Sequence, residues 1–419
     1  MYIQREGLKM HGIKRSYCDL IQRYCSYFPI VALVGVRQCG KTTLLKTLDE
    51  EWKLFDLEKI SDYNYISLDP DLFLRLNNNK IAIDEAQLLP SLFSALRVAV
   101  DNDRNKYGRY IITGSSSPEL IQSISETLAG RIGIIEVSPL LLSETIINSP
   151  ANLYSLINDP SLIKDTLLFK QTADLEMIHH YWLKGGYPEP FIRNDSGFYD
   201  HWKENYINTY VERDISRLFP SLNRMRFKQF IQTLAYYSGT VINYSDIARS
   251  LQVSQPTVRE YFKIAHGTFI WREILPYDKN TEKRITKHPK GYVRDSGILH
   301  HLLRINNLSQ LLTHPKMGLS FESMVIEEII RNLNARGVIF DYYYYRTSNG
   351  GEIDLILEGT FGIIPIEIKY SQHIGKKDII TLKEFVKVND CPIGIVVNNG
   401  EKVVFLDEKI ICIPFGFCL

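Results

Sequence analysis

The sequence predicts an α/β protein whose first domain is built on a parallel sheet. Three observations predict this fold: short apolar runs recur along the first 140 residues, a glycine-rich motif follows one of them, and polar residues close the others. The carboxyl ends of parallel strands meet at one edge of a sheet, where ligands bind. The polar residues after these runs are therefore the first candidates for a functional site.

Length and composition narrow the classes of protein to consider. A chain of 419 residues is long enough for roughly two to four domains. The net charge of +1 argues against a surface that binds polyanions as a whole, so any nucleic-acid contact would come from local patches. Six scattered cysteines without a C-x-x-C pair predict reduced thiols. With charged first residues and no apolar run of transmembrane length, we expect a cytoplasmic protein without a membrane partner.

Residues 35–43 follow the apolar run 29–34 and match the pattern G-x-x-x-x-G-K-[ST] at each fixed position. Glycines let such a P-loop turn its backbone N–H groups toward an anion, and the helix expected near Lys41 adds its positive end. We expect the loop to bind ATP with Mg²⁺, with Lys41 on the β- and γ-phosphates and Thr42 on the metal. The alternative is a chance glycine-rich turn.

A second apolar run, 80–83, ends in two acids, Asp84 and Glu85. This is the form of a Walker B strand, in which Asp84 would hold the shell of Mg²⁺ and Glu85 would polarise the attacking water. The alternative is that both acids only cap the helix that follows, because carboxylates favour helix N-termini.

Two further strands are expected in this region. Residues 64–69 alternate in polarity and end in Asp-Pro, which predicts a strand that runs into a turn. Residues 109–117 are expected to form another strand, which ends in hydroxyl groups, so Thr113 or Ser115 would lie near the γ-phosphate or the lytic water as a sensor. The alternative for these serines is a turn that caps the helix expected from Pro118.

Arg131 precedes the apolar strand expected over 132–137. It would stabilise the charge on the transferred phosphoryl group, in cis or across a subunit interface. The alternative is an exposed arginine at a strand end. The nucleotide-binding residues predicted in this domain are Gly35, Arg37, Gln38, Cys39, Gly40, Lys41, Thr42, Thr43, Asp84 and Ser115, and the predicted catalytic residues are Glu85 and Arg131.

Six segments occur in a specific order: GVRQCGKTT, IAIDEAQ, IITGSSS, TLAGR, GGYP at 185–188 and TYVERD at 209–214. This order resembles a large bacterial and archaeal family of predicted AAA-type ATPases, in which the ATPase module precedes a C-terminal domain of unknown function. The resemblance spans nearly the whole chain. It implies a P-loop α/β ATPase with a helical lid that carries the GGYP segment. The segment between Asp69 and Lys80 is shorter than is typical of the family.

Residues 242–267 carry a helix-turn-helix pattern after a helix expected over 225–240. Ser254 is a suitable N-cap of the second helix. A version that reads DNA would present the first turns of this helix to a major groove, namely Gln255, Thr257 and Arg259. The hairpin expected over 274–293 would form a basic wing that contacts phosphates, with Lys279, Lys283, Arg284, Lys287 and Lys290. The alternative, which the neutral charge favours slightly, is a winged helix that packs against the ATPase domain.

The last part of the chain has acidic residues at a recognisable spacing. Glu322 begins a helix, Asp354 lies in a strand, and Glu367 and Lys369 close the next strand on a shared face. This order resembles the PD-(D/E)xK nuclease fold, which implies Mg²⁺ ligation by Asp354, Glu367 and Glu322, with Lys369 orienting the nucleophilic water. The alternative is a solvated Glu-Lys pair on a fold without activity. The aromatic strand 342–345 could stack bases, although packing is its more common role.

These observations predict four parts: a P-loop ATPase core (1–150), a helical lid and connector (151–222), a winged-helix domain (223–305) and a PD-(D/E)xK nuclease-like domain (306–419). The first hypothesis is a Mg²⁺-dependent ATPase coupled to a nuclease-like module that processes DNA or RNA. The second is a nucleotide-controlled interaction protein with an inactive nuclease-like scaffold. A homo-oligomer or a partner protein fits either. A kinase is a weaker hypothesis, because Glu85 beside Asp84 favours water as the acceptor.

Overall fold

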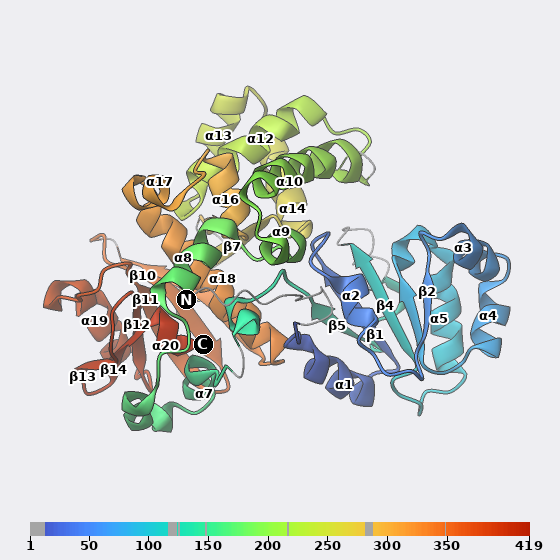
Figure 1. Ribbon diagram of the computed structural model, residues 1–419, viewed down its shortest axis with the longest axis horizontal. Helices are drawn as coiled ribbons and strands as arrows, with labels where there is room; N and C mark the ends of the chain where they lie inside the picture. The colour runs from blue at the N-terminus through green and yellow to red at the C-terminus, as the bar shows by residue number, and fades with distance from the viewer. Residues whose placement is uncertain are drawn as a thin grey trace.

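The computed structural model describes residues 13–115, 124, 126–146, 149–215, 218–280, 288–347 and 349–419, with only the backbone at Ser115 and Ser196. These residues form a five-stranded sheet and a nine-stranded sheet. The two sheets lie at opposite sides of the molecule, and a group of helices lies above and between them in the view of Figure 1. The N-terminal domain thus reaches the C-terminal domain partly through this helical group.

The first sheet is parallel, in the order β2-β3-β4-β1-β5. This confirms the parallel sheet predicted for the N-terminal domain. The central strand β1 pairs with β4 on one side and β5 on the other, and its six residues are all buried. The strands are β1 (Ile30–Gly35), β2 (Lys53–Asp56), β3 (Ile81–Asp84), β4 (Tyr110–Ser115) and β5 (Ile132–Glu136).

The strand predicted over 64–69 is wrong, because two helices occupy this segment: α3 (Ile60–Ser67) and α4 (Pro70–Leu76). Asp69 is the N-cap of α4 and accepts a hydrogen bond from the backbone N–H of Leu72 at 2.9 Å. Pro70 takes the first helical position, where its missing N–H costs nothing. The Asp-Pro pair therefore begins a helix, and the edge strand is β2, whose four partly exposed residues form no apolar run.

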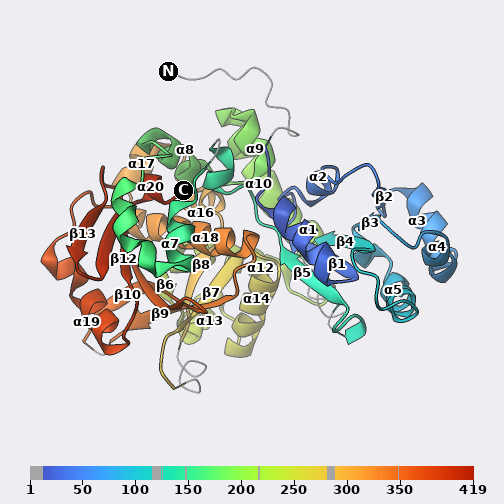
Figure 2. The same cartoon turned by 90° about the horizontal axis from the view of Figure 1, so that it is seen from below.

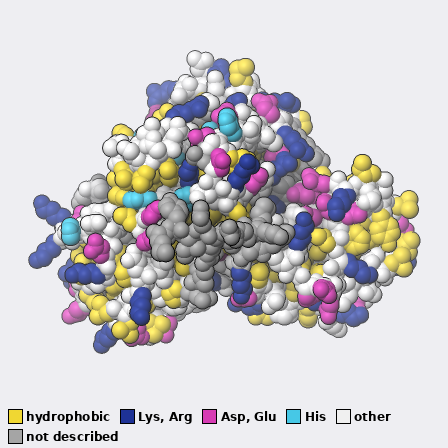
Figure 3. All heavy atoms as spheres, in the orientation of Figure 1, with side chains coloured by type: hydrophobic (Ala, Val, Ile, Leu, Met, Phe, Trp, Pro, Cys, Tyr) yellow, Lys and Arg dark blue, Asp and Glu magenta, His cyan; other side chains and the backbone are white. Residues whose placement is uncertain are grey.

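Helices cover both faces of the first sheet (Figure 2). One face, with Ala32 of β1, packs against α3, α4 and α5 (Ser91–Asp101). The other face, with Leu33, packs against α1 (Tyr17–Tyr27) and belongs to a core that continues into the rest of the molecule. Figure 3 shows apolar side chains at the outer surface of this domain, where Tyr65 and four aliphatic residues are exposed: Ile60, Leu68, Leu72 and Leu76.

The helical group begins after the first sheet and contains the GGYP segment. Gly185 has φ +76° and follows α8, and a Cβ on Gly186 would lie 2.2 Å from the carbonyl oxygen of Leu140. Both positions therefore require glycine. The helices are α7 (Asn152–Asn158), α8 (Leu175–Lys184), α9 (Pro188–Arg193), α10 (Ser196–Thr209), the π-helix η5 (Tyr210–Ile215), α12 (Arg224–Tyr237), α13 (Tyr244–Leu251) and α14 (Gln255–Gly267). Among the residues described before α8, the 3₁₀ helices are η2 (Ala86–Leu88), η3 (Leu142–Thr145) and η4 (Pro160–Leu168).

The second sheet runs across the predicted boundary between the winged-helix and nuclease-like parts. Strand β7 (Trp271–Pro276) pairs antiparallel with β8 (Lys290–Val293) and parallel with β9 (Phe340–Arg346). The hairpin and the C-terminal strands are therefore one sheet. The other strands are β6 (Thr240–Val241), β10 (Glu352–Gly359), β11 (Gly362–Ile368), β12 (Gly394–Asn398), β13 (Val404–Asp407) and β14 (Ile410–Pro414).

A long helix, α18 (Met317–Ala335), crosses the middle of the molecule and is buried over most of its length. It contributes to the core that includes Leu33 of the first sheet. The remaining helices are α16 (Ser296–Leu302), α17 (Leu308–Thr313), α19 (Ile380–Val388) and α20 (Phe415–Cys418), with the 3₁₀ helix η6 (Lys376–Ile379). Within the described ranges, none of the helices combines the length and apolarity needed to span a bilayer.

Candidate functional site

The P-loop joins β1 to the short helix α2 (Lys41–Leu45). Its backbone is left-handed at Gln38 (φ +61°) and at Gly40 (φ +98°), as expected for a loop that turns its N–H groups inward. The Lys41 side chain is only 5% exposed. Its ammonium group donates to the carbonyl oxygens of Gly35 and Val36, at 2.9 and 3.0 Å. Lys41 is therefore folded back onto the loop that contains it.

Asp84 and Glu85 lie where β3 ends, on the strand next to β4. Asp84 is 2% exposed and accepts a hydrogen bond from the hydroxyl of Thr113 on β4. The same hydroxyl accepts from the backbone N–H of Glu85 at 3.3 Å. Thr113, one of the two predicted sensors, thus connects both acids. The side chain of Ser115, the other sensor, lies outside the described residues, as does Pro118.

Glu85 has left-handed backbone, with φ +55°, which is uncommon for a residue that carries a Cβ. Its carboxylate accepts a hydrogen bond from the side-chain amide of Gln87. Such a backbone conformation costs free energy, so it persists only where the surrounding structure stabilises it. Residues of this kind cluster at functional sites. Glu85 lies between the end of β3 and the start of the 3₁₀ helix η2, where this backbone conformation turns the chain.

The helical group contributes a residue to the P-loop region that the sequence did not predict as functional. Arg37 of the P-loop forms an ion pair with Asp214 of the π-helix η5. Burial raises the pKa of Asp214, while Arg37 opposes the shift and nearby Glu85 adds to it. Asp214 belongs to the TYVERD segment, which the resemblance singled out without a role. Asp214 thus lies close to residues from both predicted motifs of the nucleotide site.

Arg15, which precedes α1, also contacts the P-loop. Its guanidinium donates to the carbonyl oxygens of Cys39 and Ser138, at 2.9 and 2.7 Å, and forms an ion pair with Glu144 at 3.0 Å. The side chain is almost fully buried. No pattern around Arg15 marks it in the sequence, because each of its partners lies on a segment distant in the chain.

Arg131 lies at the wrong edge of the sheet for the predicted role in cis. It precedes β5, which runs parallel to β1, and Ile132 pairs with Ile30 at the start of that strand. The P-loop follows the other end of β1, roughly 16 Å away at 3.3 Å per residue. Arg131 instead forms a double ion pair with Asp101, at 2.8 and 3.0 Å. A role in a neighbouring subunit stays a prediction.

The four residues predicted in the C-terminal domain come together. Glu322 lies on α18, Asp354 on β10, and Glu367 at the end of β11. One carboxylate oxygen of Asp354 accepts from the backbone N–H of Ile368 at 2.8 Å, which places it beside Glu367. Lys369 forms an ion pair with Glu367. We call Glu322, Glu352, Asp354 and Glu367 the acidic cluster.

Lys290, predicted as an exposed wing residue, lies inside the acidic cluster, so that prediction is wrong. Its side chain is buried, and its Nζ atom is 2.8 Å from Glu322 Oε1, 2.5 Å from Glu352 Oε1 and 3.9 Å from Asp354 Oδ1. The reason is that β8 lies between β7 and β6 within the sheet. Lys279 is exposed. The other predicted wing residues, Lys283, Arg284 and Lys287, lie outside the described residues.

Burial and repulsion between neighbouring carboxylates raise the pKa values of Glu322 and Glu367 in the acidic cluster. Burial raises the pKa of Glu322 to about 7, and the negative charge of Asp354 adds to the shift, while Lys290 opposes it. Burial and Asp354 likewise raise the pKa of Glu367 to about 8 against the effect of Lys369. Burial lowers the pKa of Lys290, but the surrounding carboxylates outweigh it and raise the pKa overall.

The acidic cluster offers hard oxygen donors of the kind that Mg²⁺ prefers. Glu367 Oε2 is buried and has no hydrogen-bond partner among the described residues. In the arrangement seen here, however, no three carboxylate, imidazole or thiol groups of the described chain are placed to hold one metal ion. The types of donor in the cluster fit a divalent metal. The ammonium group of Lys290, however, lies between the carboxylates that would bind it.

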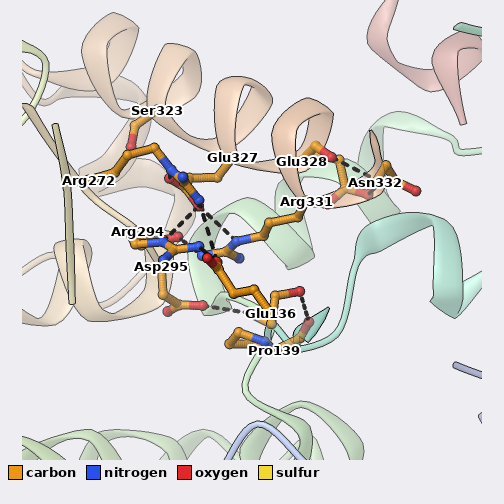
Figure 4. A network of polar contacts seen from close by, with 12 residues as sticks. Glu136, Pro139, Arg272, Arg294, Asp295, Ser323, Glu327, Glu328, Arg331 and Asn332 are labelled. Atoms are coloured by element: carbon orange, nitrogen blue, oxygen red, sulfur yellow. Dashed lines mark hydrogen bonds and ion pairs between the residues drawn. The ribbon is translucent and has the colours of Figure 1, made fainter. Parts of the chain in front are cut away.

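A buried ionic network connects the first sheet to α18 (Figure 4). Glu327 accepts hydrogen bonds from Arg272 and Arg294 and forms an ion pair with Arg331, and these charges hold its pKa well below the usual range despite burial. Arg294, which directly follows β8, also pairs with Glu136 at the end of β5. The hairpin of β7 and β8 thus contacts both the first sheet and α18 through charged side chains.

The predicted helix pair is present as α13 and α14, and Ser254 caps α14 through the backbone N–H of Thr257 at 3.3 Å, as predicted. Gln255 and Arg259 are exposed, and the guanidinium of Arg259 lies 4.2 Å from the ring centroid of Tyr244. In the aromatic strand, Tyr345 packs against Phe385, with ring centroids 4.8 Å apart. This contact supports packing as the role of that strand.

Family models match three successive parts of the chain. Residues 27–146 match the AAA domain, residues 175–309 match a domain of unknown function (DUF8612), and residues 317–418 match another (DUF4143). Among solved structures, the Walker-type ATPase PABY2304 of Pyrococcus abyssi has a TM-score of 0.42 and 16% identity, over 68% of this chain and 93% of that one. AMPPCP-bound DnaA from Aquifex aeolicus has a TM-score of 0.22 and 14% identity, over 59% and 86%. Similarity this low carries no argument about function.

Two curated relatives are more similar in sequence. Uncharacterized protein Rv2008c of Mycobacterium tuberculosis and Uncharacterized protein Mb2031c of Mycobacterium bovis are each 33% identical to the chain over 347 residues. The matched region is 82% of this chain and 71% of each relative. The P-loop in its parallel sheet, the AAA match and this identity agree, and the chain belongs to the AAA-domain family that includes these two mycobacterial proteins.

Proposed function

We propose that this protein binds ATP with Mg²⁺ and hydrolyses it. The observation that carries the proposal is that the P-loop and the acids Asp84 and Glu85 follow parallel strands of one sheet, on either side of β4. Lys41 would leave the carbonyl oxygens of Gly35 and Val36 for the phosphates. The remaining residues of the phosphate site would be Gly35, Arg37, Gln38, Cys39, Gly40 and Thr43, with Ser115 at the end of β4.

The oxygen donors near the P-loop fit Mg²⁺. Thr42 offers an exposed hydroxyl and Asp84 a buried carboxylate whose hydrogen-bond partner is neutral. When bound with ATP, Mg²⁺ would offset the charge that develops on the phosphate oxygens. Glu85 would orient the attacking water and accept its proton, while Thr113 and Gln87 hold the Glu85 backbone and carboxylate in place.

Replacement of Lys41 tests the proposal. Lys41→Ala should remove most ATP binding and hydrolysis, because no other residue of the loop supplies a buried ammonium group. The matched control is Lys46→Ala, which changes an exposed lysine at the end of the same helix. Binding is measured by titration with a fluorescent ATP analogue and hydrolysis by phosphate release. Wild-type turnover in Lys41→Ala would refute the assignment of the P-loop.

A second candidate function is metal-dependent cleavage of DNA or RNA by the C-terminal domain. The convergence of Glu322, Asp354, Glu367 and Lys369 favours it. With Asp354 and Glu367 as metal ligands, Lys369 would orient the nucleophilic water. The test is incubation of labelled DNA or RNA with Mg²⁺ or Mn²⁺, comparing wild type, Asp354→Ala and the exposed control Asp390→Ala. Equal cleavage by all three would assign the activity to another site.

Lack of cleavage by the wild type would favour the other function class, a nucleotide-controlled interaction protein with an inactive nuclease-like scaffold. Its partner would be a second copy of the chain or another protein. The exposed apolar residues of α3 and α4 support such a contact, because apolar surface gains most from burial. Size measurement with and without ATP tests for a homo-oligomer.

A further inference from the structure

Lys290 and the carboxylates around it come from two different parts of the chain. Lys290 lies on β8, before the segment that matches the C-terminal domain, whereas Glu322 and Asp354 lie within that segment. An ammonium group has three N–H donors. Those of Lys290 meet Glu322 at 2.8 Å and Glu352 at 2.5 Å, and Asp354 lies 3.9 Å away. The lysine is 3% exposed, so these carboxylates replace water as its surroundings.

We propose that Lys290 is the resident cation of the acidic cluster and that it excludes divalent metal ions from the cluster in this conformation. A metal shared by Glu322 and Asp354 would need their oxygens within about 2.0–2.6 Å. The Nζ atom of Lys290 lies between these two carboxylates and uses Glu322 Oε1, which also accepts from the hydroxyl of Tyr292 at 2.6 Å. The ammonium and a divalent ion therefore compete for one position.

A second observation marks the cluster as a place for a cation. Glu367 is 6% exposed, and its Oε2 atom has no hydrogen-bond partner in the described part of the chain. A buried carboxylate oxygen in that state costs free energy unless a donor or a cation reaches it. Among the residues that the structure describes, the four carboxylates form ion pairs with two lysines, Lys290 and Lys369. Removal of Lys290 would leave a site with hard donors and excess negative charge, which are the properties that bind Mg²⁺ or Mn²⁺.

Lys290 also connects the cluster to the AAA domain. It begins β8, and Arg294, directly after this strand, pairs with Glu136 at the end of β5. A shift of the first sheet relative to α18 would therefore act on the strand that carries Lys290. The meaning of this exclusion for cleavage depends on the nuclease-like function proposed above, whereas the exclusion of metal does not.

Binding of Mn²⁺ to the full chain without nucleotide tests the proposal, with free Mn²⁺ measured by electron paramagnetic resonance. Wild type and Asp354→Asn should bind Mn²⁺ alike, because the cluster contributes no site tighter than about 1 mM. Lys290→Met should gain a site at least ten-fold tighter, and the double variant Lys290→Met/Asp354→Asn should lose it. An Asp354-dependent site in wild type, or no gain in Lys290→Met, would overturn the proposal. Lys279→Met, on the same hairpin, is the matched control.

Thermal unfolding covers the case in which Lys290→Met folds poorly, because this variant leaves buried carboxylates without their cation. Mn²⁺ should raise the midpoint of Lys290→Met and leave that of wild type unchanged, since only the variant binds the ion in its folded state. An equal rise in both would contradict exclusion by Lys290. If Lys290→Met does not fold even with Mn²⁺, the test is the Mn²⁺ binding of wild type against that of Asp354→Asn. Tighter binding by wild type would then overturn the proposal. Mn²⁺ bound by Lys290→Met without cleavage of DNA or RNA would refute the nuclease function and leave the exclusion standing.

Discussion

Asp84 in the AAA domain and Glu322 in the C-terminal domain are both buried carboxylates, but they have different partners. Asp84 accepts a hydrogen bond from the hydroxyl of Thr113, and Glu322 accepts from the ammonium of Lys290. A hydroxyl orients a carboxylate without adding an opposite charge, whereas the ammonium at 2.8 Å is a cation that already occupies a position beside the carboxylate. A buried carboxylate is therefore available to a metal in the first site, whereas in the second site it already has a cation as its partner.

The two sites also differ in how the chain assembles them. Asp84 and Thr113 lie on adjacent parallel strands of one domain. The acidic cluster takes its lysine from β8 and its carboxylates from α18, β10 and β11. A site assembled within one sheet can form wherever that sheet forms. A site shared between segments depends on how those segments pack, so it can change when they move.

The largest effect is expected at Glu85. Glu85→Gln should retain ATP binding and slow hydrolysis by roughly 10²- to 10⁴-fold, because the amide cannot accept a proton from water. Phosphate release and nucleotide titration measure the two properties separately, and Glu58→Gln, an exposed change in the same domain, is the control. Loss of binding together with hydrolysis would instead make Glu85 structural.

A smaller effect is expected at Thr113, and it tests the neutral partner of Asp84. Thr113→Val removes hydrogen bonds to Asp84 and Glu85 and should slow hydrolysis by roughly 10- to 100-fold, the effect of losing one bond to a charged group. The Mg²⁺ concentration that gives half-maximal rate should also change. Thr233→Val, which removes a hydroxyl contact on α12, should leave both unchanged. Unaltered turnover in Thr113→Val would show that the hydrogen bond from Thr113 to Asp84 does not contribute to hydrolysis.

The pH dependence of stability tests the acidic cluster, which is the second of the two sites compared. The folded protein raises the pKa of Glu367 to about 8, above the ordinary value near 4.3, so it binds this proton more tightly than the unfolded chain does. That contribution to stability is complete below the unfolded pKa and is lost as pH rises through the folded one. In buffer without metal, the unfolding temperature of wild type should fall more steeply from pH 5 to 9 than that of Glu367→Gln.

The control for this measurement is Glu384→Gln, which changes an exposed glutamate on α19 and should keep the wild-type slope. Parallel curves for Glu367→Gln and wild type would show that Glu367 ionises at an ordinary pH. In that case the cluster would hold more positive charge than its two lysines supply.

The smallest effect is expected at Arg131. In dilute solution Arg131→Ala should hydrolyse ATP within about two-fold of wild type, because its ion pair with Asp101 lies at the edge of the sheet away from the P-loop. Asp101→Ala should behave in the same way. A large loss in dilute monomer would contradict this placement, whereas a loss that appears only as protein concentration rises would indicate a role in a neighbouring subunit.

Local patterns in the chain predicted much of the AAA domain. The P-loop, the run that ends in Asp84 and the strand that contains Thr113 are each encoded by adjacent residues, so glycine and buried apolar residues suffice to recognise them. The failed strand at 64–69 has a local cause too. Asp69 and Pro70 can begin a helix as well as end a strand, and burial of Ile66 and Phe73 against the sheet favours helices.

Contacts between distant residues could not be predicted in this way. Arg37 pairs with Asp214 across 177 positions, and Arg15 pairs with Glu144 across 129. Lys290 looked like part of a solvated wing because the lysines and arginine around it are close in sequence. Its true partners, Glu322 and Glu352, lie on α18 and β10, which approach Lys290 only after the chain has folded.

The amino-acid order alone therefore specified the types of group available: a phosphate-binding loop, two acids after a strand, and the acids and lysine of the C-terminal domain. Folding decided which of these groups meet and with what partner. The physical reason is that hydrogen bonds and ion pairs act over a few ångströms, while the residues that form them lie tens to hundreds of positions apart. Thr113 beside Asp84 and Lys290 beside Glu322 are both products of packing, and this packing gives the two carboxylates different chemistry.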